Sequence, residues 1–137
     1  SGLTVNPYHG CQHRCAYCYA TYEWSPEFYD RIYAKSNSVE ILDRELASWK
    51  DTKIDPVMIS SATDAYQPAE LRYGLTRKCI NVLQKYNVPY YVFTKSAIIE
   101  RVRYEPAQVG MHAPGLCQED PAIRRYGRVP LHQVVQR

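Results

Sequence analysis

The feature that most constrains the fold is an alternation of short strand patterns with longer helical patterns over residues 1–97. Three short apolar or β-branched runs bounded by turn residues predict strands, at residues 3–5, 57–59 and 88–94. Apolar residues at helical spacing predict helices, at residues 39–50 and 76–86. Strands that alternate with helices favour parallel pairing with right-handed crossovers. The sequence therefore predicts an α/β fold.

Polar segments follow each predicted strand, at the point where the strand ends. They comprise residues 10–20 after the first strand, residues 60–67 after the second, and Lys95 and Ser96 after the third. Ligands of helix-flanked parallel sheets bind at the carboxyl ends of the strands, where such segments meet. We therefore expect the three segments to converge on one edge of the sheet.

The segment GCQHRCAYCYA, residues 10–20, carries three cysteines in the pattern C-x3-C-x2-C, namely Cys11, Cys15 and Cys18. Three thiolates on one short loop can hold three corners of an iron–sulfur cube and leave the fourth iron open. A zinc ion would need a fourth ligand, which His9 or His13 could supply to make a Cys3His site. The spacing favours the iron–sulfur interpretation and leaves zinc as the alternative.

Composition narrows the protein class. The chain has 137 residues, enough for one domain with a hydrophobic core. Its net charge of +3 gives no strong electrostatic case for nucleic acid or an anionic membrane, and no apolar run approaches the length of a membrane span. The chain has five cysteines, an odd number, and three of them lie in one short loop, which suits a metal in a reducing compartment better than a disulfide framework. We therefore expect a cytoplasmic protein.

Residues 98–137 differ in amino-acid composition and in apolar periodicity from the preceding part of the chain. They contain no lysine, six arginines and four of the nine prolines, and their apolar periodicity fades. We assign no strand there. The segment is expected either to be an irregular C-terminal segment or to be foreign to the domain formed by residues 1–97.

Several motifs together resemble a known family. The cysteine pattern with Tyr17 before the last cysteine resembles the signature of radical S-adenosylmethionine enzymes. The run VNPYHGCQHRCAYCYA is similar to the branch related to spore photoproduct lyase, often labelled DNA repair photolyase-like. The runs SSATDAYQPAE at residues 60–70, LTRKCINVL at residues 75–83 and YVFTKS at residues 91–96 fit the same branch. The resemblance covers about residues 3–97.

The resemblance implies a fold and a reaction. Family members build a partial parallel (β/α) barrel of six units, of which this chain shows about three. A 4Fe–4S cluster on the three cysteines would bind S-adenosylmethionine at its open iron. An electron from the cluster, delivered by a reductant such as flavodoxin or ferredoxin, would break a carbon–sulfur bond. The resulting 5′-deoxyadenosyl radical would take a hydrogen atom from an unknown substrate, and nucleic acid enters only by analogy with the family.

The resemblance also implies roles for individual side chains. Tyr17 would lie beside the adenine of S-adenosylmethionine, and Ser61, Thr63 and Asp64 would contact its amino group. Lys95 would meet its carboxylate, with Ser96 in the same cofactor-binding run. Each role has a structural alternative: loop packing for Tyr17, a turn cap for Asp64 and a solvated strand end for Lys95.

Two further interpretations of the whole chain stay open. The first is a small Cys3His zinc module that serves stability or interaction rather than catalysis. The second is a catalytically incompetent fragment of a radical S-adenosylmethionine enzyme, because strands four to six of the barrel would complete the cofactor pocket.

Overall fold

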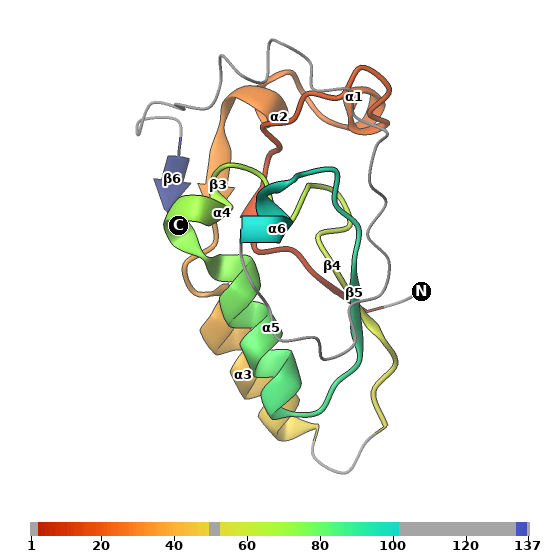
Figure 1. Cartoon of the computed structure of the whole chain (residues 1–137), viewed down its shortest axis with the longest axis vertical. Coiled ribbons are helices and arrows are strands. Elements are labelled where there is room, and N and C mark those ends of the chain that lie inside the picture. The colour runs from red at the N-terminus through yellow and green to blue at the C-terminus, as the bar shows by residue number, and fades with distance from the viewer. Residues whose placement is uncertain (1–2, 50–52, 102–133, 137) are drawn as a thin grey trace.

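The computed structural model describes residues 3–49, 53–101 and 134–136 (Figure 1). The strands are β1 Thr4–Val5, β2 Tyr8–His9, β3 Ile32–Ala34, β4 Val57–Ile59, β5 Tyr90–Val92 and β6 Val134–Gln136. The helices are α1 Ala20–Glu23, α2 Glu27–Asp30, α3 Ser38–Ser48, α4 Glu70–Tyr73, α5 Leu75–Lys85 and α6 Ile98–Arg101. The two longest helices, α3 and α5, each separate two strands of one sheet.

That sheet has three strands in the order β1–β4–β5, and both pairings are parallel. Thr4 lies opposite Met58, and Val57 lies opposite Tyr90. The three predicted strands are therefore present, and their predicted parallel pairing is confirmed. Because the strands run in the same direction, their carboxyl ends lie at one edge.

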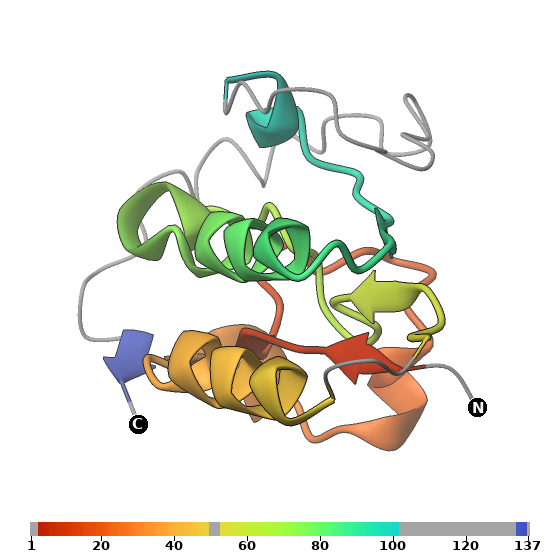
Figure 2. The same cartoon turned by 90° about the horizontal axis from the view of Figure 1, so that it is seen from below.

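Helices α3 and α5 lie side by side against one face of this sheet, as Figures 1 and 2 show from two directions. The predicted apolar faces of both helices are buried there. The core they share with the sheet includes Leu42, Leu46, Val57, Ile59, Cys79, Ile80, Leu83, Val88, Tyr90 and Val92. Side chains alternate along a strand, so Met58 and Phe93 point to the opposite face, away from the two helices.

A second small sheet escapes the sequence analysis. Strand β2 pairs with β3 in antiparallel fashion, and β3 pairs with β6 in parallel fashion. Helix α2 is a single turn that follows Pro26, and the chain then enters β3 directly. Strand β2 has only two residues and β3 follows the turn α2 without a break, so neither stands out from its surroundings as a separate strand pattern.

The C-terminal segment requires one correction. No strand was expected after residue 97, yet β6 pairs with β3, a partner distant in sequence. Helix α6 also lies in this segment. Residues 102–133, with Cys117, lie outside the described residues.

The partial barrel stays a prediction. Within the described residues, β1 and β5 are the two outer strands of the parallel sheet, each paired on one side. No helix in this part of the chain is long and apolar enough to cross a membrane.

Candidate functional site

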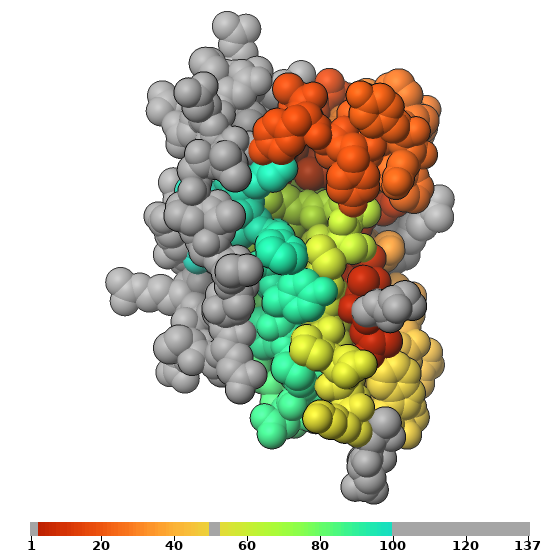
Figure 3. All heavy atoms as spheres, turned by 90° about the vertical axis from the view of Figure 1, so that its right-hand side faces the viewer, coloured from red at the N-terminus to blue at the C-terminus, as the bar shows by residue number. Residues whose placement is uncertain are grey.

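A cavity of about 410 Å³ lies at the carboxyl ends of β4 and β5. Cys11, Cys15 and Cys18 all line it. So do five of the six other predicted site residues, namely Tyr17, Ser61, Thr63, Asp64 and Lys95. Met58 and Phe93 contribute apolar wall from the face of the sheet that α3 and α5 leave uncovered. Figure 3 shows the orange cysteine-loop region overhanging the yellow-green and teal strand ends, with a recess between them. The predicted convergence of three segments is therefore confirmed.

Ser96 is the predicted site residue that does not line this cavity. Its Oγ accepts a hydrogen bond of 3.2 Å from the backbone N–H of Ile98, the first residue of α6. Its own N–H donates to Thr94 Oγ1 at 3.1 Å. The side chain therefore caps the start of a helix, a common role for serine.

Cys11 is held in place by the side-chain amide of Gln67, which is fully buried. Gln67 Nε2 donates to the carbonyl oxygen of Gly10 at 3.1 Å, and Gln67 Oε1 accepts from the backbone N–H of Gln12 at 3.2 Å. One amide thus pairs with the backbone on both sides of Cys11. The Cys11 N–H itself donates to the carbonyl oxygen of Phe28 at 3.1 Å.

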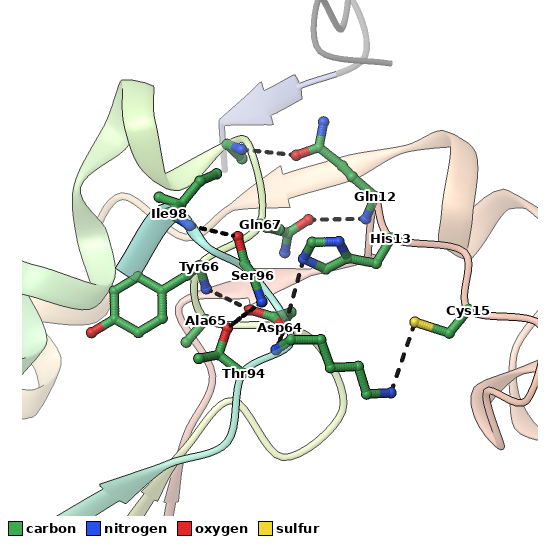
Figure 4. Close-up of polar contacts among 12 residues, drawn as sticks. Gln12, His13, Cys15, Asp64, Ala65, Tyr66, Gln67, Thr94, Ser96 and Ile98 are labelled. Atoms are coloured by element: carbon green, nitrogen blue, oxygen red, sulfur yellow. Dashed lines mark hydrogen bonds and ion pairs between the residues drawn. The ribbon is translucent and has the colours of Figure 1, made fainter. Parts of the chain in front are cut away.

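Gln12 completes a reciprocal connection between the two loops. Its Oε1 accepts a hydrogen bond of 2.8 Å from the backbone N–H of Ala69 (Figure 4). Gly10 lets the cysteine loop pass close to the backbone of Phe28 and Arg31. Its φ is +89°, and an added Cβ would lie 2.4 Å from the carbonyl oxygen of Arg31. Such a contact excludes any side chain at this position.

The Asp64 carboxylate joins the loop after β4 to the end of β5. Its Oδ1 accepts from the Tyr66 N–H at 2.8 Å and from Thr94 Oγ1 at 2.7 Å. Its Oδ2 accepts from the Lys95 N–H at 2.8 Å (Figure 4). This is the turn-cap role that was the alternative for Asp64, extended to a second strand, and it makes Asp64 a positioning residue for Lys95.

His13 faces the same carboxylate from the cysteine loop. Its Nε2 lies 3.6 Å from Asp64 Oδ2, which is longer than a hydrogen bond. Burial lowers the pKa of the imidazole, with Lys95 acting in the same direction, while Asp64 acts in the opposite one. The neutral imidazole is therefore favoured, and its buried Nε2 has no hydrogen-bond partner among the described residues.

The ammonium group of Lys95 points into the cysteine loop. Its Nζ lies 4.2 Å from the centroid of the Tyr17 ring and 3.8 Å from Cys15 Sγ. The first distance is typical of a cation–π contact. Lys95 therefore places its charge between the aromatic ring before the last cysteine and the sulfur of the middle one.

Two hydroxyl groups at the cavity lack partners within the described part of the chain. Ser60 Oγ and Thr63 Oγ1 are buried without a hydrogen bond, and both residues line the cavity. Ser60 also has a φ of +62°, an uncommon conformation for a residue with a side chain. Buried polar atoms normally have partners, so the two hydroxyls are suited to a polar ligand.

Ser61 has a partner within the chain. Its Oγ and its N–H both lie within hydrogen-bonding distance of Asn6 Oδ1, at 3.2 and 2.9 Å. The carbonyl oxygen of Ser61 accepts a hydrogen bond of 2.8 Å from Tyr19 OH. These bonds tie the loop after β4 to the loop after β1 and to the end of the cysteine loop.

The cysteines differ in their surroundings. Cys11 is buried, and burial raises the pKa of its thiol to about 11. Cys15 and Cys18 are half-buried, and within the described residues none of the three forms a disulfide. No set of three or more His, Cys, Asp or Glu side chains in the described ranges lies close enough to share one metal ion. A cube differs from a single ion in this respect, because each cysteine binds a different iron.

Neither histidine of the zinc alternative joins the three sulfurs in one tetrahedral set. The His9 ring lies 5.1 Å from that of Trp24 and 5.4 Å from that of Phe28, in a second cavity. His13 lines the cysteine cavity but faces Asp64. The donor set at the cavity therefore suits a group held by three thiolates together with a polar ligand.

Sequence analysis missed the residues that hold the loops together. Asn6, Gln12, Tyr19 and Gln67 make the bonds between segments 42 to 57 residues apart. A buried glutamine has no signature of its own in a sequence. The only available signal is position, since Gln67 lies in a polar segment after a buried strand.

Comparison with known proteins places the chain beside longer relatives. Uncharacterized proteins of Mycobacterium tuberculosis and Mycobacterium bovis are each 32% identical over 136 aligned residues, which cover 89% of this chain and 39% of the relative. An uncharacterized protein of Methanocaldococcus jannaschii is 29% identical over 101 residues, or 71% of this chain and 36% of the relative. The chain thus spans about two fifths of the length of these curated relatives. No family model and no solved structure matches it.

Proposed function

We propose that the chain carries the cluster-binding part of a radical S-adenosylmethionine enzyme. Cys11, Cys15 and Cys18 would hold a 4Fe–4S cluster, and S-adenosylmethionine would bind beside it. When bound, the pair supplies reductive cleavage of a carbon–sulfur bond and a 5′-deoxyadenosyl radical that abstracts hydrogen from an unknown substrate. The observation that carries the proposal is the shared cavity. There three cysteines that form no disulfide meet Lys95 and two hydroxyls that have no hydrogen-bond partner within the described residues.

The residues around the cysteines are suited to different groups of S-adenosylmethionine. Lys95 is suited to the carboxylate of S-adenosylmethionine, because its ammonium lies at the cavity, 3.8 Å from Cys15 Sγ. Tyr17 is suited to the adenine, since its ring is largely exposed at the cavity. Thr63 and Ser60 are suited to the polar methionine end through their buried hydroxyls.

Asp64 takes a different role in this proposal from the one the resemblance implies. Three donors from the chain already engage its carboxylate. Its contact with the amino group of S-adenosylmethionine stays a prediction. That contact would require Oδ2, which already accepts from the Lys95 N–H, to accept a second hydrogen bond. Its positioning of Lys95 rests on the bond to the Lys95 N–H.

The proposal extends to partners and compartment. A cluster of this kind needs an electron donor, for which a flavodoxin or ferredoxin is the expected class, and a reducing compartment such as the cytoplasm suits its free thiols. The zinc module and the incompetent fragment are the competing proposals. The geometry supports the zinc module less well than the iron–sulfur cluster, because His9 lies outside the cysteine cavity.

Metal content tests the proposal directly. Anaerobic reconstitution with iron and sulfide should give a brown protein with about four irons per chain. Replacing Cys11, Cys15 or Cys18 by alanine should remove the iron, whereas Cys79→Ala, the matched buried control, should retain it. A folded protein that stays colourless and binds one zinc ion, lost on replacing His9 or His13, would establish the zinc module instead.

Product formation separates the enzyme from the fragment. The reconstituted chain, reduced anaerobically with S-adenosylmethionine, should release methionine and 5′-deoxyadenosine. A chain that binds the cluster but releases neither product is the incompetent fragment.

A further inference from the structure

A second cavity, of about 340 Å³, lies between the end of β2, helix α2 and strand β3. Figure 1 shows α2 near the top of the view leading directly into β3. His9 lines this cavity, whereas Cys11, two residues further along the chain, lines the cysteine cavity. Its volume is at the lower end of the range for small-molecule sites.

Strand β3 and the residues on either side of it line this cavity with two basic side chains and one aromatic ring between them. Ile32 and Ala34 are buried in the second core cluster. Because side chains alternate along a strand, Arg31, Tyr33 and Lys35 point to the other face, and all three line the cavity. In the described part of the chain, neither Arg31 nor Lys35 forms an ion pair with a carboxylate.

Aromatic rings form the facing wall. The rings of Trp24 and Phe28 are nearly parallel, with an interplanar angle of 17° and centroids 5.5 Å apart. His9 meets both rings edge-on, and its centroid lies 5.9 Å from that of Tyr33. Phe28 is buried, whereas Trp24 is 42% exposed, so the indole can take a further planar ring.

The charge balance at the cavity favours an anion. Two cations, Arg31 and Lys35, face one carboxylate, that of Glu27. A guanidinium and an ammonium bind phosphate or carboxylate groups through charge-assisted hydrogen bonds. Because the cavity is small, an anionic group attached to a planar ring that stacks on Trp24 would lie within reach of Arg31 and Lys35.

We propose that this cavity is a second ligand site, which takes a planar aromatic anion of mononucleotide size. The ring stacks against Trp24 and Tyr33, and the phosphate or carboxylate group binds Arg31 and Lys35. This inference does not depend on the function proposed for the cysteine cavity. The aromatic wall and the two cations are both needed for selectivity. Aromatic stacking alone is weak and accepts many planar rings, and surface cations alone bind any anion.

Tryptophan fluorescence provides the test, because Trp24 and Trp49 are the two tryptophans of the chain. A Trp49→Phe protein leaves Trp24 as the reporter. It is titrated with AMP, with adenosine, which lacks the anion, and with ribose 5-phosphate, which lacks the ring. We expect AMP to quench Trp24 with saturation and each of the other two to bind at least tenfold more weakly.

Variants then locate the site. Arg31→Ala should weaken AMP about tenfold, whereas Lys78→Ala on the exposed side of α5, the charge-matched control, should leave the affinity unchanged. Lys95→Ala should also leave it unchanged, which distinguishes this site from the cysteine cavity. The proposal is overturned by no quenching with any probe, by equal responses to AMP and ribose 5-phosphate, or by an affinity that follows Lys95 rather than Arg31. Circular dichroism of each variant confirms that loss of binding is not loss of fold.

Discussion

The side-chain amide of Gln67 hydrogen-bonds the carbonyl oxygen of Gly10, 57 residues away in the sequence, at 3.1 Å. With its second bond to the Gln12 N–H, this amide fixes the backbone on both sides of Cys11. Further along the loop, the Cys18 N–H donates to the carbonyl oxygen of Cys15 at 3.0 Å. Gln67 thus holds the backbone around Cys11 directly to the loop after β4.

Replacing Gln67 by leucine should damage the loop measurably. The change leaves the Gly10 carbonyl and the Gln12 N–H buried without this partner, so the free energy of unfolding should fall by about 2 kcal/mol. Urea unfolding of the metal-free protein measures this loss. Gln84→Leu, on the exposed face of α5, is the matched control, and equal stability of the two variants would disprove the clamp.

Lys95 is expected to contribute to S-adenosylmethionine binding. Loss of a charge-assisted hydrogen bond to a carboxylate should weaken binding to the reconstituted protein by about 10- to 100-fold in Lys95→Ala. Lys95→Arg should recover part of the affinity, and Lys78→Ala should lose none. Calorimetric titration gives the affinities, and parallel iron analysis gives the cluster content. If Lys95→Ala loses iron rather than affinity, the lysine supports the cysteine loop through Cys15 instead.

The left-handed backbone of Ser60 is expected to lower the stability of the fold. Its left-handed backbone costs about 1 kcal/mol that glycine does not incur. Ser60→Gly should therefore raise the unfolding free energy by about 1 kcal/mol, while Ser60→Ala removes the hydroxyl but keeps the backbone cost. Thermal or urea unfolding compares the two variants. Equal stabilities of Gly and Ala at this position would contradict the strain argument.

The buried thiol of Cys79 should make the fold sensitive to alkaline pH. Burial raises its pKa from 9.0 to about 11, so the folded state favours the neutral thiol more than the unfolded state does. This stabilisation is complete below pH 9 and is lost as the pH rises from about 9 to 11, by up to about 1.4 kcal/mol per pH unit.

The Cys79→Ala variant isolates this contribution. Cys11, whose pKa is also raised by burial, acts equally in both proteins and cancels in the difference. The raised pKa of Tyr8 cancels except for the small part that comes from Cys79 itself. We expect the stability difference between wild type and variant to shrink or change sign from pH 8 to pH 10 in urea unfolding. A difference that does not vary with pH would show that the thiol stays neutral in both states.

The sequence predicts the larger elements because they carry periodic patterns. The run Val57–Ile59 is buried and bounded by turn residues, and α5 places Cys79 and Leu83 on one apolar face. Parallel topology then brings the cysteine loop, the loop after β4 and Lys95 to one edge without further information. The convergence of those segments is the part of the site that sequence reasoning can supply.

The remaining features depend on contacts between distant residues. Strand β3 follows a single helical turn, so no window of sequence separates it from its surroundings. The bonds of Gln67 and the capping role of Ser96 are set by which backbone groups lie nearby in three dimensions. Side-chain polarity alone cannot distinguish a ligand-binding serine from a helix cap, so the resemblance groups Ser96 with the cofactor residues although it caps α6.

The most direct test of the central claim is the electron paramagnetic resonance spectrum of the reduced, anaerobically reconstituted chain with and without S-adenosylmethionine. An open iron held by Cys11, Cys15 and Cys18 should give a 4Fe–4S signal whose shape changes when S-adenosylmethionine binds, and the change should be weaker in Lys95→Ala. A 4Fe–4S signal that is identical with and without saturating S-adenosylmethionine, or the absence of any cluster signal from a folded protein, would contradict it.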